Sequence, residues 1–551
     1  MRKRRGTAAF LAMVMVFSLA LAGCSGGEKK SSNTNDGQTT GGDTQESTET
    51  GYQTTYGSKQ FDNVTLTVEL FDRSNAPQGS TVLNNRWVEY AQEEMKKVGI
   101  NLEFVAVPRS EEITKIQTMM AAGTAPDIVL TYTRSIAEDY FTQGGTYDLA
   151  PYIDGEEQAV NLKNYLGENV LNVARNGDDN LWAVSARRAS ATKNNLFIRK
   201  DWLDKLEMEI PTTTDELYEV LKAFKENNPE GREDIIPYFS VTIGEETADR
   251  VDVLATSFMT SVMDDTEFNI KSVFPVYSDE GYAEYLRYLN KLYNEGMIDQ
   301  EYYTSNDYTA LLQEHVVNGR VGVFEFNVNG NVDNLRGGLL QNLKANNPDA
   351  DIVAIPPLLN NHDGEMYNIL YAANGAYCIV PKTCANPEAA VTYMDWLATQ
   401  EGGFALYHGF EGEHYELEDG VPIVIDADYN ALDKDWIRHD MFLVGNQGYF
   451  FSEEDFVKSA SKEIPGFEEY VFKNYEYAIA GNAKNTTAYT SPTQSENISE
   501  IQLAVDEYLV KCMTCPPEEF DDMLAAYKNA LKNAGMDTVI QERTEYYEAL
   551  K

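Results

Sequence analysis

The chain has 551 residues, a formal net charge of −44 and a hydrophobic content of 43%. So negative a protein repels phosphate backbones and anionic lipid headgroups, which argues against nucleic acid and bare membrane surfaces as partners. The length exceeds what one hydrophobic core normally holds, so we expect at least two lobes. The five cysteines are too few for a disulfide framework.

The N-terminus has the parts of a secretory signal. Residues 2–5 are all basic, and the apolar run at 7–22 that follows is too short to span a bilayer. The run ends in Leu-Ala-Gly-Cys at residues 21–24, which resembles the bacterial lipobox. The resemblance implies a signal peptide over residues 1–23 and acylation, as with palmitate, at Cys24. The alternative is a plain signal with an incidental cysteine.

Residues 24–59 consist almost entirely of Gly, Ser, Thr, Asn, Gln and charged side chains. Such a segment cannot bury apolar surface, so we predict a disordered tether. Its r.m.s. reach would be roughly 30–35 Å. Cleavage of the signal would remove four basic residues and no acid, leaving the mature chain at −48.

The folded body begins near Phe61 with alternating strand and helix patterns. Val, Leu and Thr alternate in a predicted strand at 64–70, and helical spacing follows at 84–98. A second strand is predicted at 100–107, a helix at 111–123 and a third strand at 128–130. This order indicates a parallel sheet with right-handed crossovers.

Several motifs in the body resemble family 1 extracellular solute-binding proteins of carbohydrate ABC importers. They keep the family's order along the chain, from the third strand to the C-terminus. The matching segments are 119–129 (MMAAGTAPDIV), 148–154 (DLAPYID), 181–184 (LWAV), 195–206 (NLFIRKDWLDKL), 211–217 (PTTTDEL), 318–324 (NGRVGVF), 386–390 (NPEAA), 520–524, 531–537 and 541–543.

The resemblance implies an α/β, periplasmic-binding-protein-like fold of two lobes, each with a mainly parallel sheet, and a ligand cleft between them. We expect lobe 1 to comprise 60–185 and 357–402, and lobe 2 to comprise 186–356 and 403–551. The implied function is capture of a carbohydrate and its delivery to ABC transporter permease subunits. The long C-terminal insertions favour an oligosaccharide as the ligand. The protein is expected to be a monomer on the outer face of the cell membrane, without a cofactor.

Sugars are bound by aromatic faces and by planar amide, carboxylate and guanidinium groups. In an open α/β sheet the ligand lies beyond the carboxyl ends of the strands. By resemblance, four segments approach that position, and a loop with few strand or helix signals, around residues 436–438, is a fifth candidate. The candidate ligand-binding residues are Tyr132, Arg134, Trp182, Arg187, Arg188, Glu325, Phe326, Asn327, Tyr371, Asn374, Trp436 and Arg438. Trp202 and Trp396 lie on amphipathic patterns and are predicted to be core residues.

A calcium loop found in many members of this subgroup is shortened here. The segment 227–237 offers Asn228, Glu230, Glu233 and Asp234, with an Arg between them. Calcium takes six to eight oxygen ligands, so we favour a metal-free turn over a calcium site.

Other functions remain as alternatives. No G-x-S-x-G, H-E-x-x-H or Walker motif is present, which favours a binding protein over an enzyme. A surface polysaccharide-degrading enzyme or a glycan adhesin is the rival class. The negative charge favours a neutral oligosaccharide, although Arg134, Arg187 and Arg188 could bind uronic acids. Cys512 and Cys515 could be a redox pair, but incidental thiols or a local disulfide are favoured.

Overall fold

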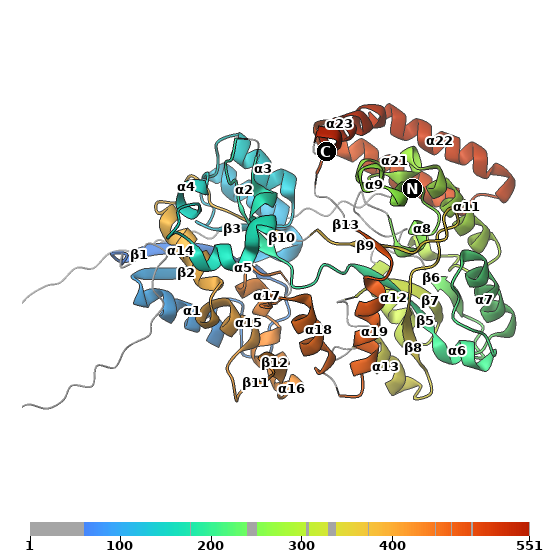
Figure 1. The fold of residues 1–551 in the computed structure, drawn as a ribbon, viewed down its shortest axis with the longest axis horizontal. Helices are drawn as coiled ribbons and strands as arrows, with labels where there is room; N and C mark the ends of the chain where they lie inside the picture. Colours follow the sequence, from blue (N-terminus) through green and yellow to red (C-terminus); the bar gives the residue numbers. More distant parts are fainter. Residues whose placement is uncertain are drawn as a thin grey trace, which may run out of the picture. The chain divides into compact units, whose positions relative to one another are not determined.

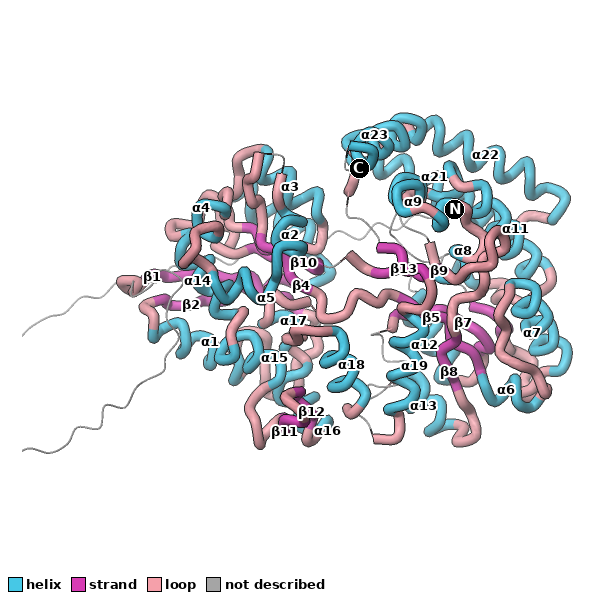
Figure 2. Tube along the Cα trace, in the orientation of Figure 1, coloured by secondary structure: helices cyan, strands magenta, loops and turns pink. Residues whose placement is uncertain are grey.

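A computed structural model describes residues 60–549 except 177, 240–250, 305–307, 329–337, 373, 447, 464 and 486–488. The predicted signal peptide, Cys24 and the tether lie outside the described residues. The body from Gly51 onward forms one compact unit. Figures 1 and 2 show its helices and strands.

The five elements predicted at the start of the body are confirmed. They are β1 (Val64–Asp72), α1 (Arg86–Lys97), β2 (Ile100–Pro108), α2 (Glu112–Ala122) and β3 (Val129–Thr131). The Asn85 side chain caps α1 by accepting hydrogen bonds from two backbone N–H groups. Gly123 ends α2 at φ 66°, a left-handed conformation that favours glycine. β1 and β2 are parallel, and Val68 forms a parallel bridge to Ile128.

The strand pairs of the two larger sheets are mostly antiparallel, which corrects the expectation of mainly parallel sheets. In the first, β10 (Asn374–Ile379) lies between β3 and β4 (Val184–Arg187) and is antiparallel to both. The second sheet has the order β6 (Ile236–Phe239), β7 (Val321–Asn327), β5 (Asn194–Arg199) and β8 (Ile352–Ile355). Only β6 and β7 are parallel there. The physical reason is that β10 enters the first sheet from a different core, without the crossover helix that a parallel connection needs.

The first hydrophobic core takes its buried side chains from residues 61–189 and 376–450. Trp396 is fully buried in it, as predicted. The remaining elements around this core are α3 (Arg134–Thr142), α4 (Ala150–Ile153), α5 (Val160–Leu171), α14 (Pro387–Leu397), α15 (Ala405–His408), β11 (Tyr415–Glu418), β12 (Val421–Val424), α16 (Ala427–Asn430) and α17 (Arg438–Met441).

A second core takes its buried side chains from residues 196–369 and 501–539, and includes Trp202 as predicted. A smaller cluster covers the other side of the second sheet. The helices from α6 to α13 are α6 (Lys200–Lys205), α7 (Thr214–Asn227), α8 (Val253–Thr256), α9 (Asp265–Lys271), α10 (Pro275–Ser278), α11 (Glu280–Asn294), α12 (Tyr308–Val317) and α13 (Leu339–Asn346).

The C-terminal part of the chain closes over the second core. In Figure 1 the red helices α21, α22 and α23 lie beside α9 and α11. β9 and β13 form a short parallel pair. These later elements are β9 (Tyr367–Leu370), α18 (Glu453–Ser461), α19 (Glu468–Ala478), β13 (Asn482–Asn485), α20 (Pro492–Glu496), α21 (Ile498–Thr514), α22 (Phe520–Asn533) and α23 (Met536–Ala549).

The two cores divide the chain differently from the expected lobe boundaries. Leu358, Tyr367 and Ile369 pack in the second core, whereas buried residues from Phe404 to Phe450 pack in the first. No motif after Gly402 pointed to the first core, so the sequence could not reveal this return of the chain.

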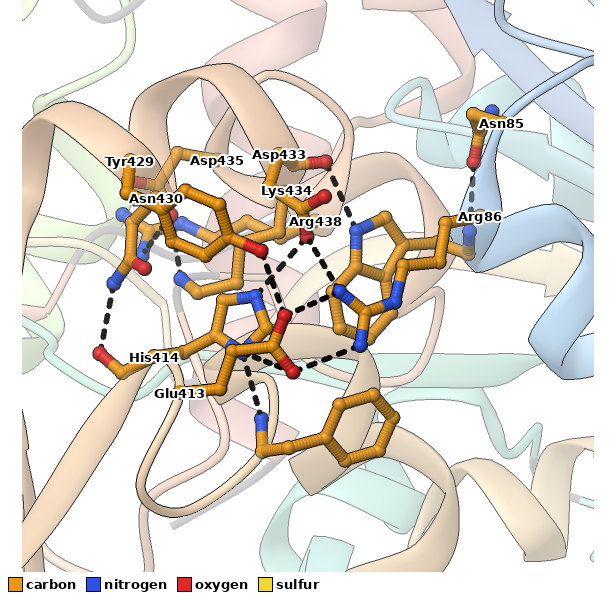
Figure 3. Close-up of polar contacts among 12 residues, drawn as sticks. Asn85, Arg86, Glu413, His414, Tyr429, Asn430, Asp433, Lys434, Asp435 and Arg438 are labelled. Atoms are coloured by element: carbon orange, nitrogen blue, oxygen red, sulfur yellow. Dashed lines mark hydrogen bonds and ion pairs between the residues drawn. The ribbon is translucent and has the colours of Figure 1, made fainter.

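Residues 404–450, which we call the returning segment, form hydrogen bonds and an ion pair with the first residues of α1 (Figure 3). The Arg86 guanidinium donates to both carboxylate oxygens of Glu413, at 2.6 and 2.9 Å, and the Tyr429 hydroxyl donates to the same carboxylate at 2.6 Å. His414 Nε2 lies 3.0 Å from an Asp433 carboxylate oxygen. Trp87 Nε1 donates to the Asp433 carbonyl at 3.0 Å. The segment is therefore part of the first core's surface.

The cysteines of the described residues, Cys378, Cys384, Cys512 and Cys515, are free and buried. Among the described helices, none combines the length and apolar character needed to cross a membrane.

Candidate ligand-binding site

Three segments connect the two cores and bond to one another. The first runs from β4 to β5, the second from β9 to β10, and the third follows α17. The backbone N–H of Tyr371 donates to the Ala191 carbonyl at 2.8 Å, which joins the first two segments. Arg187 joins the third, because its N–H donates to the Val444 carbonyl at 2.8 Å and its carbonyl accepts from Asn446 at 2.7 Å.

Four predicted residues meet where these connections lie. The Arg188 guanidinium lies 4.1 Å from the Tyr371 ring centroid, and its Nε donates to the Asn374 carbonyl at 2.9 Å. The Tyr371 hydroxyl accepts a hydrogen bond from Asn327 Nδ2 at 2.6 Å. Residues from both connecting segments and from the end of β7 are thereby brought together.

Arg187 is directed elsewhere. Successive side chains of an extended chain point to opposite sides. The Arg187 guanidinium donates to the carbonyls of Tyr165 and Phe451 at 3.1 and 2.6 Å. It therefore holds the third connection, while Arg188 takes the side of Tyr371.

A second group lies after β3. The Tyr132 side chain, 37% exposed, is stacked on Phe71, and the Arg109 guanidinium lies 4.6 Å from its ring centroid. Arg134 begins α3, and its guanidinium lies 5.4 Å from the Trp182 ring centroid. Trp182 is fully buried, so in this conformation it supports Arg134 and offers no face to a ligand.

The arginines of these two groups affect the pKa values of Tyr132 and Tyr377. Burial raises the pKa of Tyr132, and the positive charges of Arg73, Arg109 and Arg188 oppose that rise. Tyr377 packs against Trp182 with ring centroids 5.1 Å apart. Burial likewise raises the pKa of Tyr377, opposed chiefly by Arg134. We call Arg73, Arg109, Arg134 and Arg188 the arginine cluster.

Arg73, Arg109 and Tyr377 were missed by the sequence reasoning. Arg73 directly follows β1 and Arg109 directly follows β2. Carboxyl ends of parallel strands meet at one edge of a sheet, which is where ligands bind in open α/β folds. Considering the two or three residues after each predicted strand, at 64–70 and 100–107, would have found both arginines.

The remaining predicted residues lie outside this group. Glu325 is fully buried and accepts hydrogen bonds from Asn194 Nδ2 at 2.8 Å and from the Val253 N–H at 2.7 Å. Phe326 belongs to the smaller cluster on the second sheet. Both side chains therefore have structural contacts in this conformation.

Trp436 and Arg438 lie in the returning segment of the first core. The Trp436 carbonyl accepts a hydrogen bond from Asn75 at 2.9 Å. Arg438 pairs with Asp435 at 2.9 Å and lines a cavity of about 110 Å³ together with Lys434 and His408. This cavity shares no lining residue with the arginine cluster.

The shortened loop between α7 and β6 uses its acids to bind arginines. Glu230 accepts hydrogen bonds from Arg199 and from Trp202 Nε1, each at 2.8 Å. Asp234 pairs with Arg232 at 2.8 Å. Within the described residues, no group of three or more His, Cys, Asp or Glu side chains is arranged to hold a metal ion.

The sequence and the fold define a class of protein. Residues 80–404 match the family model of the bacterial extracellular solute-binding proteins, and the chain belongs to that family. The fold is similar to that of an extracellular solute-binding protein from Bifidobacterium longum subsp. infantis. The TM-score is 0.64 at 19% identity, covering 90% of this chain and 99% of the other. The fold is accordingly two-lobed and periplasmic-binding-protein-like.

Two relatives come from Bacillus subtilis (strain 168). The polygalacturonan/rhamnogalacturonan-binding protein YtcQ is 23% identical over 473 residues, covering 83% of this chain and 87% of YtcQ. Lipoprotein LipO is 25% identical over 347 residues, covering 61% of this chain and 66% of LipO. The match thus spans slightly less than two thirds of LipO and most of YtcQ.

Proposed function

We propose that the protein captures an oligosaccharide between its two lobes and delivers it to the permease of an ABC importer. The observation that carries this proposal is the meeting of Arg188, Tyr371 and Asn327 at the connections between the cores. An aromatic ring, a guanidinium and an amide are the groups that bind sugar faces and hydroxyls. The polysaccharide-binding name of YtcQ supports the same ligand class.

The two cores suggest how binding is signalled. We take lobe 1 to be built on the first core, including residues 404–450, and lobe 2 on the second. A ligand that contacts both lobes favours the closed arrangement, because only that arrangement makes every contact. A permease can then distinguish loaded from empty protein by shape, with no catalytic step.

Small-angle X-ray scattering tests this proposal. The mature-length chain carrying Cys24→Ser, which cannot be lipidated, is titrated with neutral and acidic oligosaccharides and followed by calorimetry and scattering. We expect saturable binding and a smaller radius of gyration with the cognate sugar. Binding at an unchanged radius would instead support a rigid adhesin, and release of cleaved product would support an enzyme.

We further propose that Cys24 carries the lipid that holds the monomeric protein on the outer face of the membrane. Two acyl chains give stable attachment, whereas one gives marginal binding. Cys24→Ala should release the protein into the medium or leave it unprocessed. A signal-cleaved Cys24→Ala protein that stays firmly on the membrane would contradict the anchor.

A further inference from the structure

Arg188 differs from the other members of the arginine cluster in its partners. Arg73 pairs with Asp440 at 2.8 Å, Arg109 with Glu112 at 2.6 Å and Arg134 with Glu138 at 3.1 Å. Arg188 contacts the Tyr371 ring and the Asn374 carbonyl, and no carboxylate in the described part of the chain forms an ion pair with it.

Arg188 is half-buried and forms no ion pair within the described residues, which favours the binding of an anion beside it. Removing a guanidinium from water costs free energy that an opposite charge offsets. Burial lowers the pKa of Arg188, and the groups that oppose this effect are the phenols of Tyr371, Tyr132 and Tyr377. The planar guanidinium presents paired N–H donors that match the two oxygens of a carboxylate.

The negative charge of the whole protein does not cancel this local preference. At physiological ionic strength, exposed charges farther apart than about 8 Å are largely screened, whereas partly buried charges are screened much less. The acids paired to Arg73, Arg109 and Arg134 are each already neutralised by a guanidinium. The acids near the arginine cluster that these ion pairs involve are therefore already compensated, and Arg188 forms no ion pair within the described residues.

We propose that the oligosaccharide carries a carboxylate, as a uronic or sialic acid residue does, and that Arg188 binds this carboxylate. The proposal rests on the proposed function and names the substrate class of the same site. It replaces the preference for a neutral ligand that the net charge alone suggested. Arg187, whose guanidinium is occupied by two backbone carbonyls, has no part in this recognition.

Calorimetry with matched ligands tests the proposal on the mature-length Cys24→Ser chain. The probes are trigalacturonic acid, its fully methyl-esterified form, sialyllactose and maltotriose. We expect trigalacturonic acid or sialyllactose to bind at least about tenfold more tightly than the neutral sugars, because a charge-assisted pair is lost without the carboxylate. Which acidic sugar binds identifies the source of the carboxylate.

Three variants locate the effect. Arg188→Gln should lose roughly tenfold to a hundredfold in affinity for the acidic sugar, and Arg188→Lys should retain part of it because the charge remains without the planar fork. Arg287→Gln is the matched control. The Arg287 guanidinium lies 4.5 Å from the ring centroid of Phe520, a residue of the second core. This substitution therefore also removes an arginine from an aromatic ring. We expect no change in affinity.

A measurement on the unmutated protein keeps the test independent of variant folding. Affinity for the acidic sugar should fall when salt rises from about 50 mM to about 500 mM, while affinity for any neutral sugar should not. Equal or tighter binding of the neutral sugars would overturn the carboxylate proposal and leave the proposed function standing. Failure to bind any of the four probes would overturn both.

Discussion

Two arginines in this protein lie on aromatic rings in similar geometry but in opposite electrostatic settings. Arg199 lies 4.6 Å from the Trp202 ring centroid, is 1% exposed and is held by the carboxylates of Asp201 and Glu230. Arg188 lies 4.1 Å from the Tyr371 ring centroid and pairs with no carboxylate that the structure describes. The ring contact alone therefore does not distinguish a structural arginine from a ligand-binding one.

The carboxylate partners distinguish Arg199 from Arg188. The buried charge of Arg199 is balanced within the chain, and Glu230 also accepts hydrogen bonds from Trp202 Nε1 at 2.8 Å and Asn347 Nδ2 at 3.1 Å. Loss of Glu230 removes charge-assisted hydrogen bonds from a buried arginine, although Asp201 would still pair with it. Within the described residues no acid pairs with Arg188, so we infer that its counter-ion is a group of the ligand.

The largest expected effect is on the Arg199 network. Glu230→Gln should lower the free energy of unfolding by about 1.5–3 kcal/mol, because it weakens charge-assisted hydrogen bonds to a buried arginine that Asp201 still pairs with. Denaturant unfolding measures the change. Glu138→Gln is the control, since the Glu138 side chain is 43% exposed and its surface pair with Arg134 is worth about 0–1 kcal/mol. Equal effects of the two substitutions would show that Glu230 stabilises the fold through Arg199 no more than the surface acid Glu138 does through Arg134.

Acid should weaken the Arg199 network and leave the contacts of Arg188 unaffected. Hydrogen bonds from Trp202 and Arg199, together with the Arg199 charge, outweigh burial and lower the pKa of Glu230. A carboxyl whose folded-state pKa is depressed stabilises the fold above its unfolded-state pKa, and this contribution is lost as the pH falls through the folded-state value. Stability should therefore fall with acid below the unfolded-state pKa of about 4.3.

Thermal unfolding followed over that acidic range measures this dependence. Glu230→Gln should show a shallower loss of stability with falling pH than the unmutated protein, because the titrating group is absent. Arg188→Gln should keep the slope of the unmutated protein. An unchanged slope in Glu230→Gln would mean that Glu230 does not couple to folding.

A smaller effect is expected at the ring beneath Arg188. Tyr371→Phe keeps the aromatic face but removes the hydroxyl that accepts from Asn327 at 2.6 Å. We expect a loss of about 1 kcal/mol in the free energy of unfolding, with the preference for acidic sugars retained. Calorimetry and denaturant unfolding on the same preparation separate the two. Loss of the acidic preference would show that the hydroxyl, in addition to the ring, orients Arg188.

The smallest expected effect is on the stability of Arg188→Gln. Replacing a cation that forms no ion pair within the described part of the chain relieves its desolvation, so the free energy of unfolding should change by less than about 1 kcal/mol. Denaturant unfolding of the ligand-free protein tests this. A loss as large as that of Glu230→Gln would identify Arg188 as a structural arginine like Arg199.

Local sequence patterns predicted the first five helices and strands of the folded body. They also indicated the family to which the chain belongs. Alternating and helical spacing placed β1, α1, β2, α2 and β3, because side-chain periodicity follows directly from strand and helix geometry. The order of the family motifs gave the two-lobed fold, and the buried tryptophans 202 and 396 followed from amphipathic spacing. These features depend on residues that are near one another in the chain.

Only the tertiary structure decided the sheet directions, the place of residues 404–450 and the arginine partners that are distant in the sequence. β10 is antiparallel to its neighbours because the chain returns from another core, a fact that no local pattern contains. Arg73 meets Asp440 across 367 positions of sequence. Arg199 has Asp201 two positions further along the chain, but its second acid, Glu230, is 31 positions away and is brought to it by the fold.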